Sequence, residues 1–267
     1  MAITTLDGAI SGAQPRVPYV KSGSTMAAAG AMRAYNPRYA SGNPGPATAP
    51  ASGINGTALT GPGTQINRAN PGTGNAYVMG LDICASSPGM LWLIDRIWEN
   101  SGLAATSTTA QAITPAALPA RDRSGTANGV DVMAAIEWSA AGGSGTPTVT
   151  LTYTDQTNAA NRTATLLGIG SPPVGTFEIF TPGAASGGIR APTSFIQSAT
   201  RTSGTMHLVL FRVLASLPCS FANVGAASDF LTGGAPRIFD GSCLEPIWIP
   251  SATTAVNFFG GYVETQG

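Results

Sequence analysis

The apolar positions of this chain gather in short runs that are bounded by Gly, Pro, Ser and Asn. The runs are rich in β-branched and aromatic residues, which pack well on a pleated surface, so we expect each run to form a strand. No long stretch has the helical spacing of apolar residues that would compete with this interpretation. The expected strands are 76–84, 90–98, 130–139, 147–154, 163–167, 175–180, 193–200, 205–215 and 256–263.

The clearest alternation lies in segment 147–154. Val149, Leu151 and Tyr153 fall on one face of a strand there, and threonines occupy the other face. Successive side chains of a strand point to opposite faces, so this pattern predicts a strand with one buried and one exposed face.

Two segments, 90–98 and 205–215, are apolar on both faces and are therefore expected to be central strands. A polar side chain inside such a strand must find a partner, because burying an unpaired polar group is costly. The polar members that need partners are Asp95, Arg96, His207 and Arg212.

Many short strands, turn signals between them and no long helix predict an all-β fold. We expect an antiparallel β-sandwich, jelly-roll-like, in which two four-stranded sheets accommodate most of the strands.

The first 75 residues differ from the rest, since they hold many Gly, Pro, Ala and Asn and no long apolar run. One short helix is expected over 26–35, before Pro37 stops it. Such a segment is either a disordered tail or an extended arm across another subunit. The apolar anchors of this segment favour the arm, and three of them are candidate interface residues, namely Tyr19, Tyr35 and Tyr39.

The predicted organisation therefore has two parts. Residues 1–75 form an extended Gly/Pro/Ala-rich N-terminal arm with one short helix, mostly irregular, and residues 76–267 form the β-sandwich domain. If this division is right, deleting the arm leaves a folded sandwich.

Charge is scarce in this chain. Only 10 % of the 267 residues are charged, the net charge is zero, and 43 % are hydrophobic. This composition excludes a disordered polyelectrolyte and lacks the basic surplus of a nucleic-acid binder, so we expect no nucleic-acid partner. A near-zero net charge promotes association and suits a surface covered by other subunits. Lys21 is the only lysine, which fits Arg-rich interfaces and a GC-rich genome equally well.

The cysteines and the N-terminus exclude further classes. Cys84, Cys219 and Cys243 are widely spaced, and no C-x-x-C occurs, so a zinc site is not expected. A bridge between Cys219 and Cys243 is one possibility, and three free, mostly buried thiols are the favoured one. The chain starts without the pattern of a secretory signal and holds no 18-residue apolar run, so we expect folding in a cytoplasm and no membrane partner.

The search for catalytic groups finds little. His207 is the only histidine, it lies within an apolar strand, and no G-x-S-x-G occurs, so a structural role is expected. A pair of carboxylates for glycan hydrolysis, such as Asp95 and Glu137, would have to face each other across a cleft. The tryptophans lie in apolar strand contexts rather than in a cleft lining. We therefore predict no enzyme activity, no catalytic residue, no metal and no cofactor.

One charged cluster remains, formed by Arg121, Asp122 and Arg123 after the Thr/Ala/Pro-rich loop 104–120. It is either a solvated turn or a charged loop at a subunit contact. Clustering of three charges in a chain with so few favours the contact, so these residues join the candidate interface.

A series of segments runs in order through the middle of the chain. It consists of LIDRIWENSG at 93–102, PARD at 119–122, the strand 130–139, GTPTVTLTYT at 145–154 and TSGTMHLVLFRVL at 202–214. With this series, roughly residues 76–215 resemble a poorly characterised group of tailed-bacteriophage virion proteins.

This resemblance implies a structural particle component that decorates or cements the capsid through subunit contacts. It implies a symmetric homo-oligomer, a trimer as is common for capsid-decorating proteins, with the major capsid protein as partner and the virion as location. Alternatives are a structural protein of the tail or baseplate, a glycan-binding β-sandwich module for host attachment, and a glycan hydrolase.

Overall fold

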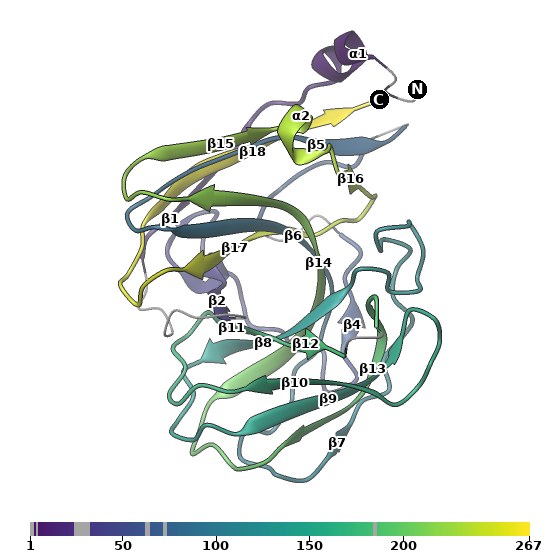
Figure 1. The fold of residues 1–267 in the computed structure, drawn as a ribbon, viewed down its shortest axis with the longest axis vertical. Coiled ribbons are helices and arrows are strands. Elements are labelled where there is room, and N and C mark those ends of the chain that lie inside the picture. Colours follow the sequence, from purple (N-terminus) through teal and green to yellow (C-terminus); the bar gives the residue numbers. More distant parts are fainter. Residues whose placement is uncertain (1–2, 4, 24–32, 62–64, 72–73, 184–185) are drawn as a thin grey trace.

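The computed structural model describes residues 3, 5–23, 33–61, 65–71, 74–183 and 186–267. Its strands form three antiparallel sheets that stack along the long axis of the molecule (Figure 1). We call them sheet A, at the top of Figure 1, sheet B, in the middle, and sheet C, at the bottom. The prediction of an all-β, antiparallel sandwich-like fold is confirmed, with three stacked sheets in place of two.

Sheet A has six strands in the order β15-β5-β18-β1-β3, with β16 also paired to β5. Two helices, α1 (Leu6–Ser11) and α2 (Phe230–Gly233), lie at its upper end (Figure 1). The strands are β1 (Val17–Lys21), β3 (Gly42–Asn43), β5 (Ala76–Ala85), β15 (Gly225–Asp229), β16 (Arg237–Ile238) and β18 (Phe258–Gln266).

Sheet B closes on itself. Its strands follow the order β14-β8-β11-β2-β17-β6, and β6 pairs in turn with β14, so these strands form a barrel with β4 added outside β6. The strands are β2 (Arg33–Tyr35), β4 (Thr57–Ala58), β6 (Gly89–Glu99), β8 (Met133–Ala140), β11 (Thr176–Ile179), β14 (Thr205–Cys219) and β17 (Leu244–Pro250). Closure removes the exposed edges that an open sheet presents.

Sheet C has the order β12-β10-β9-β13-β7. Its strands are β7 (Gln111–Ala112), β9 (Thr148–Asp155), β10 (Arg162–Leu167), β12 (Thr181–Pro182) and β13 (Ile189–Gln197). In β9 every second side chain is buried, as the alternation of Val149, Leu151 and Tyr153 predicts.

Three apolar cores result from this stacking. One lies between sheets A and B around Leu93 and Trp248, and one lies between sheets B and C around Trp138 and Leu151. The third lies inside the barrel, where Phe177 packs edge-on against Phe211. This arrangement explains the doubly apolar β6 and β14, because one face of each strand enters the barrel and the other face packs on a neighbouring sheet.

The expected strand segments all contain strands of the fold, but the sequence interpretation missed β17. This segment contains two prolines, Pro246 and Pro250, and proline is typical of positions where a strand is interrupted. Proline has no backbone N–H group to donate to a neighbouring strand. This loss is tolerated in β17 because its pairing with β2 consists of one pair of residues, Trp248 and Tyr35.

The N-terminal segment is also arranged differently from the expected arm. β1 pairs with β18, and β2 is a strand of the barrel, so two of the three sheets run across the predicted boundary at residue 75. Of the expected helix 26–35, residues 26–32 lie outside the described residues, and the remainder is β2. Because the barrel needs β2 to close, residues 76–267 do not contain all of its strands.

Candidate functional site

One part of the barrel interior is ionic. Charged and polar side chains from β6, β8, β17 and the turn that follows β2 converge there, and we call them the barrel cluster. Its members are Asn36, Arg38, Arg96, Glu99, Glu137 and Glu245.

Arg96 is the centre of this cluster. Its Nη2 lies 2.7 Å from Glu137 Oε2, its Nε lies 2.6 Å from Glu99 Oε2, and its Nη1 lies 3.3 Å from Glu245 Oε2. Asn36 donates to both Glu137 Oε1, at 2.6 Å, and Glu245 Oε2, at 3.0 Å. Such charge-assisted bonds compensate groups that have left water.

A short 3-10 helix, η1 (Pro37–Tyr39), brings two further groups to the cluster. Arg38 Nη1 lies 3.2 Å from Glu245 Oε1, and the Tyr39 hydroxyl donates to Glu137 Oε2 at 3.0 Å. Asn36 caps η1 by accepting from the Arg38 backbone N–H. One local turn therefore supplies three of the groups that fill this part of the barrel.

The electrostatics of the cluster stabilise ionised carboxylates. Burial by itself raises the pKa of Glu137, but the charges of Arg96 and Arg38 and the hydrogen bond from Arg96 outweigh it and lower that pKa to about 2. Glu137 is therefore ionised at neutral pH although it is fully buried.

A second group of charges lies on the outer face of β6. Asp95 accepts from Ser242 Oγ at 2.7 Å and from the Cys243 backbone N–H at 2.9 Å. Arg212 and Arg121 approach the same carboxylate at 3.6 and 3.8 Å. The polar side chains of β6 and β14 thus have the partners that their buried positions require.

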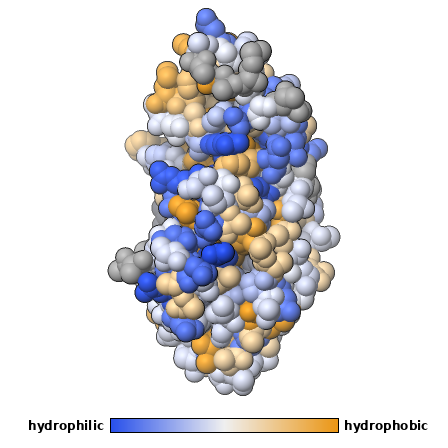
Figure 2. Space-filling view, turned by 90° about the vertical axis from the view of Figure 1, so that its right-hand side faces the viewer, coloured by the Kyte–Doolittle hydropathy of each residue, from blue (hydrophilic) through white to orange (hydrophobic). Residues whose placement is uncertain are grey.

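Charge is therefore concentrated inside the molecule. Fourteen of the 26 charged side chains are buried, which leaves twelve to reach the surface. Figure 2 shows hydrophilic residues scattered over one face among apolar residues, with one group of apolar residues near its upper end. The buried charged side chains are Lys21, Arg38, Arg68, Asp95, Arg96, Arg121, Asp122, Glu137, Asp155, Glu178, Arg201, Arg212, Glu245 and Glu264.

Exposed apolar side chains gather on sheet A and the segments that border it, and we call this set the apolar end. Among the described residues elsewhere, the large apolar side chains in the same exposure class are Leu167 on β10 and Ile196 on β13. The apolar end consists of Leu6, Ile10, Val20, Phe221, Val224, Leu231 and Phe259.

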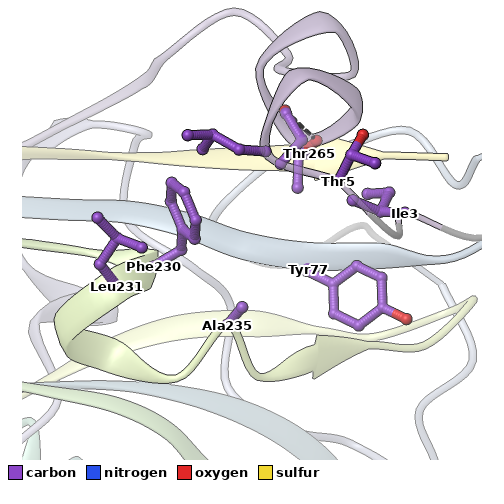
Figure 3. Close-up of a pocket in the computed structure, with 9 residues that line it drawn as sticks. Ile3, Thr5, Tyr77, Phe230, Leu231, Ala235 and Thr265 are labelled. Atoms are coloured by element: carbon purple, nitrogen blue, oxygen red, sulfur yellow. Dashed lines mark hydrogen bonds between the residues drawn. The ribbon is translucent and has the colours of Figure 1, made fainter.

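An open cavity of about 360 Å³ lies within the apolar end, between α1, α2 and β5. Figure 3 shows Phe230 and Leu231 on one side of it, with Tyr77 across from them and Ile3 nearby. Thr265 donates to the Ala9 carbonyl and thereby ties α1 to β18 above the cavity. The lining of the cavity is mostly apolar, with hydroxyl groups from Thr5, Tyr77 and Thr265.

The structure does not place the three candidate tyrosines on an exposed surface. Tyr19 and Tyr35 are buried in the chain's own interior, and Tyr39 is half-buried with its hydroxyl on Glu137. The prediction that these residues contact another subunit is corrected for Tyr19 and Tyr35, because their rings are covered by strands of the same chain.

The three charged residues of the loop 121–123 also differ in their exposure. Arg121 is buried and donates to the Arg96 backbone carbonyl, whereas Arg123 is exposed and pairs with Asp131 at 2.8 Å. Asp122 is buried and accepts from Thr126 and from several backbone N–H groups of its own loop, and these bonds outweigh burial to lower its pKa. Only Arg123 keeps a position from which it can meet a partner.

The residues of the apolar end were missed by the sequence interpretation. Leu6, Leu231 and Phe259 lie in short segments without a long alternating pattern, so nothing in the sequence separates them from core residues. Their exposure results from the tertiary fold, which places two short helices above the upper end of sheet A.

The cysteines and the candidate carboxylates can be compared with the expectations. The three cysteines are free, with Cys219 and Cys243 buried. Asp95 and Glu137 do not face each other across a cleft, since both are buried, one outside and one inside the barrel wall. Within the described ranges, no group of three or more His, Cys, Asp and Glu is arranged to hold a metal ion, and no described helix is long and apolar enough to cross a membrane.

Comparisons of this chain with protein-family models, with curated proteins and with solved structures find no match in any of the three.

Proposed function

We propose that this chain is a non-enzymatic structural subunit of a phage particle that decorates or cements the capsid. The observation that carries the proposal is the distribution of charged and apolar side chains. More than half of the charged side chains are buried, and most of the large exposed apolar side chains lie at the apolar end. Exposed apolar patches mark surfaces that contact other molecules. The resemblance of residues 76–215 to tailed-bacteriophage virion proteins gives the class of particle.

In this proposal the apolar end is the contact surface. The cavity between α1 and α2 receives an apolar side chain of the major capsid protein, and the exposed Leu6, Leu231 and Phe259 surround or extend that contact. Copies of the chain assemble as a symmetric trimer around the same particle position. The chain is located in the virion after folding in the host cytoplasm.

A particle-binding experiment tests the proposal. Particles assembled without this chain are mixed with purified wild-type protein, and co-sedimentation measures binding. We expect saturable binding of the wild type and loss of binding by Leu231→Asp, because a carboxylate in the contact must be desolvated. Absence of wild-type binding to the particles would contradict the proposal.

Leu167→Asp is the matched control. Leu167 is 63 % exposed and Leu231 is 75 % exposed, but Leu167 lies on sheet C, at the other end of the molecule. We expect Leu167→Asp to bind like the wild type. Equal loss by both variants would show that the apolar end is not the specific contact. A cryo-EM map of the particle separates a position on the head from one on the tail or baseplate.

A further inference from the structure

The only histidine of the chain has a serine as its partner. Ser139 Oγ lies 2.6 Å from His207 Nε2, and His207 Nδ1 lies 3.1 Å from the backbone carbonyl oxygen of Asn100. A carbonyl oxygen only accepts hydrogen bonds, so Nδ1 carries the proton and Nε2 is the acceptor. Ser139 therefore donates to a ring nitrogen that is free to take its proton.

The barrel positions both side chains. β8 and β14 are paired so that His207 lies opposite Glu137, and Ser139 follows two residues later on β8. The register shifts between the pairs Met206–Trp138 and Thr205–Ala140, which leaves Ser139 as an extra residue of a β-bulge. Bulges re-aim side chains and are frequent beside active sites.

The surroundings keep the imidazole neutral. His207 is buried, and burial is the main reason why its pKa is lowered. The charges of Glu137 and Glu99 raise this pKa and the charge of Arg96 lowers it, but the net shift is downward. The groups that face the ring thus come from β8 and β6. A neutral imidazole next to a hydroxyl is the arrangement that a general base requires.

Ser139 is more accessible to solvent than His207. Ser139 is half-buried near the end of β8, whereas His207 is 1 % exposed. A reagent therefore reaches the hydroxyl before it reaches the imidazole.

We propose that Ser139 is an activated nucleophile that accepts an acyl group from small activated esters or a phosphoryl group from small fluorophosphates, with His207 as the general base. This goes beyond the structural role proposed above and does not depend on it. Ser139 would be the nucleophile, His207 the base, and the Asn100 carbonyl the group that orients the base. Activated serines use the same three roles.

The step balances with the groups present. Ser139 Oγ forms a bond to the carbonyl carbon, and its proton moves to His207 Nε2. The bond from that carbon to the leaving oxygen breaks, and the leaving oxygen takes the proton as an alcohol. With a fluorophosphate, the Oγ–P bond forms and the P–F bond breaks, so fluoride leaves and the proton is released to solvent.

The test uses diisopropyl fluorophosphate on the full chain, with intact mass and peptide mapping as the readout. We expect one adduct, on Ser139, and none there in Ser139→Ala. His207→Gln should label about 10²–10⁴-fold more slowly, the usual contribution of a general base. Ser251→Ala is the matched control, because Ser251 is exposed and its Oγ donates to a backbone carbonyl instead of an imidazole. It should label like the wild type.

A second measurement does not depend on how the variants fold. The single histidine gives one set of imidazole signals in ¹⁵N NMR of the wild type, and we expect the neutral tautomer protonated at Nδ1 at pH 7. The opposite tautomer, or a protonated ring, would overturn the proposal. So would an adduct spread over several serines, or no adduct while the wild type is folded. Particle binding by Ser139→Ala is expected to be unchanged, which separates this inference from the proposed function.

Discussion

The barrel cluster and the apolar end have opposite distributions of charge. Inside the barrel, Arg96, Glu137 and Glu245 are fully buried and ionically paired, whereas Leu6 and Leu231 are largely exposed at the top of sheet A. Charged residues are almost never fully buried unless they are paired, and large apolar patches on a surface mark contacts. The difference shows that more than half of the charged side chains are buried inside the fold, whereas large apolar side chains remain exposed at the apolar end.

Breaking the barrel cluster at its centre should have the largest effect. Arg96→Met removes the guanidinium that pairs with three carboxylates and leaves them buried without compensation. We expect the free energy of unfolding to fall by about 3–5 kcal/mol in chemical denaturation. Arg123→Met is the control, since its pair with Asp131 is exposed, and it should cost at most about 1 kcal/mol. Equal losses in the two variants would contradict the comparison.

Acid should weaken the same cluster. The pKa of Glu137 is about 2 in the folded chain against an ordinary value of 4.5, so its stabilising effect is complete above pH 4.5. As the pH falls from 4.5 towards 2, the unfolded chain takes up the proton first and stability is lost, by about 3 kcal/mol at most. The stability difference between wild type and Glu137→Gln should therefore shrink over this range in pH-dependent unfolding. A difference that stays constant would show that Glu137 is not ionised inside the barrel.

Lys21 gives a smaller effect at alkaline pH, with the same sign, because stability again rises with pH. Its Nζ donates to the carbonyls of Ala40 and Gly45, and burial lowers its pKa from 10.5 to about 8. Between pH 8 and 10 the unfolded chain holds more protons than the folded one, so stability should rise with pH. We expect a gain of about 1 kcal/mol, reduced by solvent screening, that is missing in Lys21→Met. The same rise in the variant would assign the effect to another group.

The apolar end should matter least for stability. Leu231 is 75 % exposed, so Leu231→Asp should change the free energy of unfolding by no more than about 0.5 kcal/mol. Thermal unfolding of the isolated chain measures this, and the particle-binding experiment measures the contact separately. A loss of several kcal/mol would show that Leu231 supports the fold and would remove it from the contact surface.

The site was only partly predictable from sequence. The need of Asp95, Arg96, His207 and Arg212 for partners follows from their place in doubly apolar strands, and the structure supplies partners for all four. Which partners these are did not follow, because Arg96 meets Glu245 and Ser139 meets His207 across long stretches of chain. Pattern reasoning reads neighbours along a strand and not across a sheet.

The three candidate tyrosines also show that contacts across a sheet cannot be predicted from local sequence. An aromatic residue in a Gly/Pro-rich segment reads equally as an anchor on a neighbour and as part of the chain's own core. The pairing of Tyr35 with Thr176 and Trp248 decides for the core. Gly175, beside this strand, has a positive φ of 85° and leaves no room for a Cβ, which would lie 2.4 Å from the Tyr35 ring.

The sequence by itself determined the all-β class, the expected strands and the shortage of charge, because side-chain alternation and composition are local properties. The tertiary structure alone decided that β6 pairs with β14 to close a barrel, that charges fill one part of it, and that Leu231 is exposed while Tyr35 is buried. These outcomes depend on contacts between residues far apart in the chain, whose favourable free energy exists only once the sheets have assembled.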